Sequence, residues 1–207
     1  MKKFISSLLL VMMIISLTAC GSSTPSAKKT VEQYLSAAKK LDAETMSELV
    51  IPSNTEDAEI MENLTLEDED SYSKFFAKFF KDNANKMTYN ILESTENGDE
   101  ANVSVETKYI DGGPLIAATM SEAITKMLGI ALQGKEPSDD EIDEMFGDIL
   151  KEEEAKNEPT FKNQTMNINL KKQDEKWYIT EVHDELKDVI TLGFYSAVES
   201  LGNMFED

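Results

Sequence analysis

Apolar residues recur at every third or fourth position in several stretches of the chain, which predicts amphipathic helices. One helix should span about residues 27–41, and a short second helix should begin after Asp42, whose side chain suits an N-cap. A third follows the acidic stretch 67–70 and carries aromatic residues at the spacing i, i+3, i+4, i+7 and i+8: Tyr72, Phe75, Phe76, Phe79 and Phe80. This stripe could line a ligand cavity, but we favour burial in the core, where large aromatic side chains contribute most.

Two other regions alternate apolar and polar residues with period two, which predicts β-hairpins. The first hairpin should pair residues 87–91 with 103–109 and turn at Asn97-Gly98, a residue pair that favours a type I′ turn. The second should pair 166–170 with 177–182. Because hairpins build antiparallel sheets, we expect an α+β fold with a curved antiparallel sheet of two hairpins, packed by the N-terminal helices.

A two-helix insertion at 114–156 should separate the hairpins. Its first helix, 115–132, is strongly apolar, and its second begins with the capping box Ser138-Asp139-Asp140-Glu141. Met120, Met127 and Met145 lie on these helices, and flexible methionines suit a groove that adapts to a partner or an apolar ligand. We favour the simpler interpretation, in which the insertion adds a layer to the core. A C-terminal helix, capped by Asp184, should close a single domain spanning 27–207.

The run from Val31 to Asp42 and the late strand Lys176-Trp177-Tyr178-Ile179 resemble the nuclear-transport-factor-2-like superfamily. More narrowly, the chain is similar to Gram-positive lipoproteins that carry such a domain. The resemblance implies a cone-like domain, in which helices cover the concave face of the sheet. Its members range from isomerases and dehydratases to non-catalytic binding modules. The candidate residues for a pocket or groove are Tyr34, Phe76, Tyr89, Val105, Met120, Met127 and Trp177.

The N-terminal region is typical of an export signal, with Lys2 and Lys3 preceding an apolar segment over 4–17 that is too short to span a membrane. The following Leu17-Thr18-Ala19-Cys20 resembles the bacterial lipobox. This resemblance implies a signal peptide at 1–19, cleavage between Ala19 and Cys20, and a diacylglyceryl group on Cys20. Residues 20–26 would then be a flexible tether to the outer face of the cytoplasmic membrane.

Without the predicted signal peptide, the chain would be strongly acidic. Removing Lys2 and Lys3 would leave 18 lysines against 40 acidic residues, a net charge near −22, and the chain contains no arginine. Such a surface repels nucleic acid, so we expect no nucleic-acid partner. Cys20 is the only cysteine and His183 the only histidine, so we expect neither a thiolate metal site nor a cofactor.

No nucleophile elbow, phosphate loop or dinucleotide motif is present. His183 is followed by Asp184, but adjacent residues of a strand point to opposite faces, so we expect a solvent-facing histidine and a helix-capping aspartate. Two functions stay open. The first is a lipid-anchored module that binds a small molecule or a protein. The alternative is a cone-pocket enzyme of isomerase or hydratase type that uses a buried carboxylate.

Overall fold

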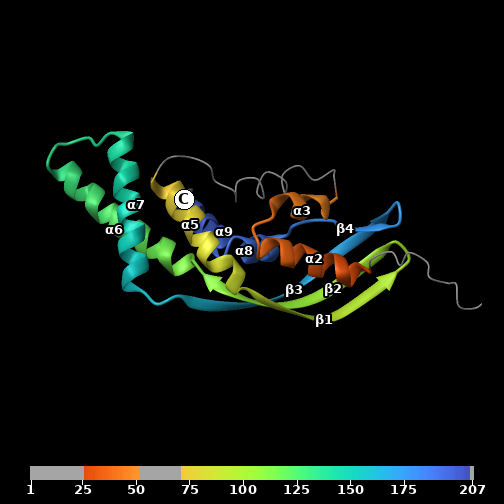
Figure 1. Ribbon diagram of the computed structural model, residues 1–207. Coiled ribbons are helices and arrows are strands. Elements are labelled where there is room, and N and C mark those ends of the chain that lie inside the picture. Colours follow the sequence, from red (N-terminus) through yellow and green to blue (C-terminus); the bar gives the residue numbers. More distant parts are fainter. Residues whose placement is uncertain (1–25, 52–70, 206–207) are drawn as a thin grey trace, which may run out of the picture.

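A computed structural model describes residues 26–51 and 71–205. Within these ranges the chain forms seven α-helices, one short 3₁₀ helix and a four-stranded sheet (Figure 1). The predicted α+β class is confirmed. In chain order the elements are α2 (Ala27–Ala38), α3 (Ala43–Glu48), α5 (Ser71–Asn83), η1 (Ala84–Lys86), β1 (Thr88–Asn97), β2 (Glu100–Asp111), α6 (Gly113–Leu132), α7 (Asp139–Lys156), β3 (Thr160–Gln173), β4 (Lys176–Ile179), α8 (Asp184–Ile190) and α9 (Phe194–Phe205).

The sheet is an open antiparallel sheet with the strand order β1-β2-β3-β4. Its centre is the long pairing of β2 with β3, which runs from Glu100↔Lys171 to Asp111↔Thr160 and joins the two predicted hairpins. Helices α2, α3, α5 and α8 lie over one face of the sheet (Figure 1). That face carries the alternating apolar side chains, so one side of the sheet packs in the core while the other meets solvent.

The turn of the first hairpin differs from the prediction by one residue. Asn97 pairs with Glu100, so the two-residue loop is Gly98-Asp99 rather than Asn97-Gly98. Gly98 has φ +63° and occupies the first central position, as in a type II′ turn. The positive φ values of a type I′ turn occur instead in the second hairpin, at Asp174 (47°) and Glu175 (65°).

The core fills the space between the sheet and the helices. Val31, Tyr34 and Leu35 of α2 are fully buried against it, as are Val103 and Val105 of β2. The aromatic stripe of α5 packs around Phe194 of α9, with the ring centres of Phe76, Phe79 and Phe80 at 5.0, 5.1 and 5.6 Å from that of Phe194. Core packing is confirmed for Phe75, Phe79 and Phe80, which are buried. The side chain of Tyr72 lies outside the described residues.

Helices α6 and α7 form the predicted insertion and project from one end of the molecule (Figure 1). Only Ile116, Thr119 and Ala123 of α6 are buried, whereas apolar side chains farther along are exposed: Ile124, Leu128 and Leu132. The insertion therefore adds to the core with the first half of α6 and with Ile149 and Leu150 near the end of α7, and the core-layer interpretation is wrong for the second half of α6. By length and mean hydropathy (1.4) α6 could cross a membrane, a test that apolar helices packed within a domain also pass.

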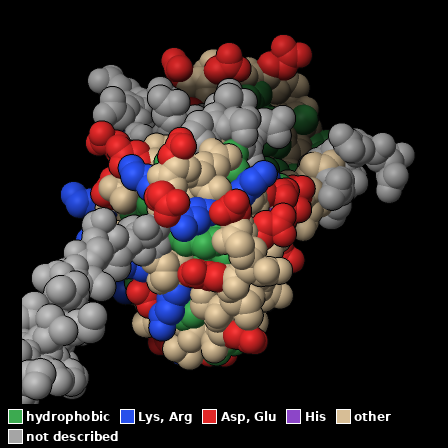
Figure 2. Space-filling model, turned by 90° about the vertical axis from the view of Figure 1, so that its right-hand side faces the viewer, with side chains coloured by type: hydrophobic (Ala, Val, Ile, Leu, Met, Phe, Trp, Pro, Cys, Tyr) green, Lys and Arg blue, Asp and Glu red, His purple; other side chains and the backbone are tan. Residues whose placement is uncertain are grey.

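Lysines lie between the acidic side chains on the face turned toward the reader in Figure 2, and no broad basic surface is visible there. The eight lysine–carboxylate ion pairs between described residues are mostly between exposed neighbours on one helix. Such pairs each contribute little to stability. The fold consequently depends on apolar packing and on the one buried ion pair described below.

Candidate ligand pockets

An apolar cavity of about 530 Å³, here called the inner pocket, lies where α6 and α7 meet α5 and α9. Helices α6 and α7 each contribute residues three or four positions apart, which share one helical face, and α5 and α9 contribute one residue each. The side chains that line it are Phe76, Ile116, Thr119, Met120, Asp139, Ile142, Asp143, Phe146, Leu150 and Val198. The volume lies in the range of small-molecule sites, and the lining is mostly apolar, as such sites require.

Thr119 places a polar atom in this apolar lining. Its residue is only 2% exposed, and its hydroxyl makes no hydrogen bond within the described part of the chain. A buried hydroxyl without a partner costs about 1–3 kcal/mol, which a ligand could offset by accepting or donating one hydrogen bond. The inner pocket thus combines apolar walls with one hydroxyl that has unused bonding capacity.

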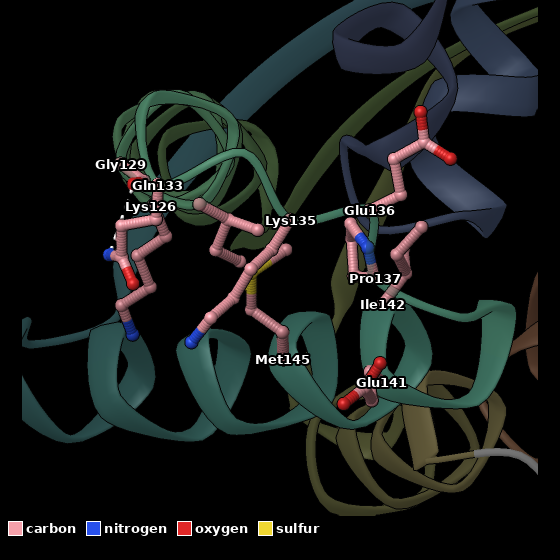
Figure 3. Close-up of a pocket in the computed structure, with 10 residues that line it drawn as sticks. Lys126, Gly129, Gln133, Lys135, Glu136, Pro137, Glu141, Ile142 and Met145 are labelled. Carbon is pink, nitrogen blue, oxygen red and sulfur yellow. Dashed lines mark hydrogen bonds between the residues drawn. The ribbon is translucent and has the colours of Figure 1, made fainter.

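A second cavity of about 670 Å³, here called the outer pocket, shares Ile142 with the inner pocket. Figure 3 shows the residues that line it. The outer pocket is formed by the second half of α6, the connection to α7 and the first turns of α7. The capping box holds this connection: Glu141 Oε2 accepts hydrogen bonds from the backbone N (2.8 Å) and Oγ (3.1 Å) of Ser138. The side chains that line the outer pocket include Lys126, Ile130, Lys135, Glu136, Glu141, Ile142 and Met145.

The seven predicted pocket residues separate into two groups. Phe76 and Met120 line the inner pocket. The other five do not come together in either cavity: Tyr34, Val105 and Trp177 are buried in the core, Tyr89 donates a hydrogen bond to the Glu32 carbonyl (3.2 Å), and Met127 is half-buried on α6. Tyr34, Val105 and Trp177 line neither cavity because α2 packs directly on the sheet face. Met127, proposed for a groove between the insertion helices, lies on α6 outside both linings.

Sequence reasoning missed Thr119 and the lysines of the outer pocket. Thr119 lies three residues after Ile116 and therefore shares its face of α6, a spacing that could have identified it. Lys126 is the only basic residue of α6, which makes it visible in the sequence as an exception within an apolar helix. Lys126 reaches the cavity only because α6 crosses α7, and no local pattern in the sequence predicts that crossing.

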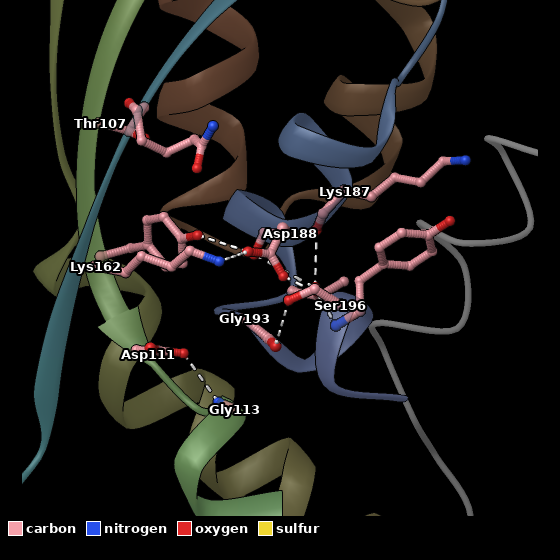
Figure 4. A network of polar contacts seen from close by, with 12 residues as sticks. Thr107, Asp111, Gly113, Lys162, Lys187, Asp188, Gly193 and Ser196 are labelled. Carbon is pink, nitrogen blue, oxygen red and sulfur yellow. Dashed lines mark hydrogen bonds and ion pairs between the residues drawn. The ribbon is translucent and has the colours of Figure 1, made fainter. Parts of the chain in front are cut away.

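Asp188 is the only buried acidic or basic residue in the described ranges, and it lies under the sheet rather than in a cavity (Figure 4). Its Oδ2 accepts hydrogen bonds from Tyr109 Oη (2.8 Å) and Lys162 Nζ (2.6 Å), and its Oδ1 accepts one from Ser196 N (3.1 Å). Burial raises the pKa of Asp188, but the bonds from Lys162, Ser196 and Tyr109 outweigh it and hold that pKa below its ordinary value. This carboxylate is therefore ionised and fully used in holding β2, β3, α8 and α9 together, so it gives no support to a buried general acid.

His183, and not Asp184, caps α8, so that prediction is wrong. Its Nδ1 accepts a hydrogen bond from Leu186 N (3.2 Å), and its Nε2 lies 2.9 Å from the Asn167 carbonyl. The neutral ring with hydrogen on Nε2 satisfies both contacts. The side chain is 24% exposed, so it is not fully solvent-facing as expected either. Both ring nitrogens bond within the fold, and the described residues contain no group of three or more metal-ligating side chains.

Cys20, the predicted lipidation site, and the predicted lipobox before it lie outside the described residues. No curated protein matches the chain. A solved structure, that of the candidate lipoprotein ycdA from Bacillus subtilis, is similar at 16% identity and a TM-score of 0.32. The similarity covers 76% of this chain and 43% of that protein, so the chain spans less than half of its length. Residues 18–121, half of the chain, match the family described as a domain of unknown function, DUF4878, and the chain therefore belongs to the DUF4878 family.

Proposed function

We propose that this protein is a lipid-anchored extracytoplasmic module that binds an apolar small molecule in the inner pocket. The export signal and the lipobox support the anchor. In this proposal Cys20 carries a diacylglyceryl group, which holds the protein at the outer face of a Gram-positive cytoplasmic membrane. Helices covering one face of a bent sheet are compatible with a cone-like, nuclear-transport-factor-2-like domain, which we keep as part of the proposal. The inner pocket replaces the sheet face as the binding site.

The anchor is tested by feeding cells an alkyne-tagged fatty acid and measuring the label on the purified protein. Wild type should be labelled, whereas Cys20→Ala should carry no label, because Cys20 is the only thiol that can be modified. Ser22→Ala, two residues farther along, is the matched control and should be labelled like wild type. A labelled Cys20→Ala, or a native protein whose N-terminal peptide still contains residues 1–19, contradicts the anchor.

One observation carries the binding function: a cavity of about 530 Å³ with apolar walls contains a buried hydroxyl whose hydrogen bonding is unused within the described residues. Two carboxylates, those of Asp139 and Asp143 on α7, also line this cavity, so the choice of a binding function rests on its mostly apolar walls and on the unused hydroxyl of Thr119. Asp188, the buried carboxylate of the described chain, lies elsewhere and is fully bonded. An uncharged ligand with an apolar body and a single polar atom near Thr119 fits the lining best.

Filling the inner pocket should abolish this binding. We expect Met120→Trp to weaken labelling of residues 116–120 by a photoreactive dodecanol at least tenfold, since the larger ring occupies the cavity. The lipidated protein in nanodiscs is titrated with the probe, and labelled residues are assigned by mass spectrometry. Met127→Trp, on the same helix but outside the cavity lining, should label like wild type. Equal labelling of all three proteins, or no labelling at 116–120 in wild type, contradicts the proposed function.

A further inference from the structure

The outer pocket differs from the inner pocket in its charge. Its floor is apolar, with Ile130, Ile142 and Met145, but two ammonium groups stand over it, those of Lys126 and Lys135. Both side chains extend toward α7 in Figure 3. Neither lysine takes part in any of the ion pairs between described residues. An apolar surface beside two available cations is complementary to a ligand with an apolar body and a negative head.

Neither acidic residue at this pocket forms an ion pair with Lys126 or Lys135, although the charge of Lys135 helps to lower the pKa of Glu141 from a distance. Glu141 is held in the capping box, and its hydrogen bonds from the backbone and hydroxyl of Ser138 lower the pKa of its carboxyl. Its position is therefore fixed at the start of α7, where the helix dipole favours a negative charge. The carboxylate of Glu136 points away from the lysines in Figure 3. The lining holds two lysines and two glutamates, and with Glu136 turned away and Glu141 held in the capping box, the ammonium groups of Lys126 and Lys135 are the charges left without an ion-pair partner among the described residues.

We infer that the outer pocket is a second binding site, which takes a single-chain anionic amphiphile. Lys126 and Lys135 would bind the head, and the chain would lie on Ile130, Ile142 and Met145. Lysine provides a flexible point charge rather than the planar fork of arginine, so a carboxylate and a phosphate head suit the site equally. Lys126 is half-buried on α6, and partial removal from water strengthens its attraction for an anion.

Photoreactive dodecanoic acid, dodecyl phosphate and dodecanol test this inference on the lipidated protein in nanodiscs. The three probes share one chain, so a difference between them reports the head group alone. We expect both anionic probes to label residues 129–133 of wild type at concentrations at least tenfold lower than dodecanol requires there. If only one anionic probe does so, the site is assigned to carboxylates or to phosphates accordingly.

Variants separate this site from the inner pocket. The double change Lys126→Gln and Lys135→Gln should weaken labelling of 129–133 by the anionic probes about tenfold and leave dodecanol labelling of 116–120 unchanged. Lys151→Gln is the matched control, because Lys151 is exposed on α7, pairs with Asp148 and lines neither pocket. Equal labelling of 129–133 by acid, phosphate and alcohol, or no effect of the double change, overturns the outer site. If dodecanol does not label residues 116–120 of wild type, that result contradicts the proposed function and leaves the outer site unaffected.

Discussion

Asp188→Asn is expected to lower the free energy of unfolding by about 3 kcal/mol, the low end of the cost of breaking a buried ion pair. The carboxylate accepts bonds at both oxygens, so an amide must present its NH₂ group to a donor on one side. Tyr109 is 0% exposed, so its Oη is too enclosed to bond water in exchange. Lys162 is 37% exposed and can return to solvent, which keeps the cost from being higher.

Urea denaturation at pH 7 measures this effect through the fluorescence of Trp177, the only tryptophan, which is 5% exposed and reports the loss of the core. Asp184→Asn is the matched control on the same helix. Its side chain is 66% exposed, so the change should stay within about 0.5 kcal/mol. A cost for Asp188→Asn no larger than for Asp184→Asn would show that the network in Figure 4 does not stabilise the fold.

The same ion pair predicts the direction of a pH effect. The pKa of Asp188 is lowered in the folded state relative to its ordinary value of 3.8. Its stabilisation is therefore complete above 3.8 and is lost as the pH falls through the lower folded value. The difference in unfolding free energy between wild type and Asp188→Asn should be constant from about pH 7 to 5 and shrink below about pH 4. A difference that grows on acidification would contradict the assignment of charge.

Local patterns in the sequence predicted the elements well, because helix and strand periodicity depend on neighbours within one turn or two residues. The stripe on α5 and the capping box of Ser138 and Glu141 are examples. A single helix was predicted over 184–205, whereas the chain breaks into α8 and α9 at Leu192 and Gly193, which have φ +53° and +83°. Gly193 was the available signal, since glycine commonly follows a helix end.

The candidate sites were harder to predict because they depend on contacts between distant parts of the chain. Tyr109 and Asp188 are 79 positions apart, and no periodicity relates them. Phe76 was proposed as a pocket residue from the aromatic stripe and Met120 from the flexibility of methionine, and both line the inner pocket. Helix α2 fills the sheet face and so excludes Tyr34 and Val105 from both pockets. This close packing of α2 on the sheet depends on the whole domain and could not be predicted from local patterns.

Gly193→Ala should cost about 3 kcal/mol or more, because it combines backbone strain with a collision. The positive φ of +83° alone costs an L-residue roughly 1–2 kcal/mol. An added Cβ would also lie 2.6 Å from Asp111 Oδ1, which accepts a hydrogen bond from Gly113 N (3.0 Å) at the start of α6. Moving Asp111 would release this bond at the junction from which the whole insertion projects.

Gly98→Ala separates the two contributions to that cost. Gly98 also has a positive φ, +63°, but a Cβ there meets no atom within 4 Å, so only the strain should be measured, about 1 kcal/mol. Urea denaturation gives both values, and hydrogen exchange at Gly113 N should accelerate in Gly193→Ala alone. If both glycine variants lose the same stability and Gly113 stays equally protected, Asp111 does not need Gly193 beside it. In that case the start of α6, and with it the placement of both pockets, must be held by the apolar contacts of Ile116 and Ala123 instead.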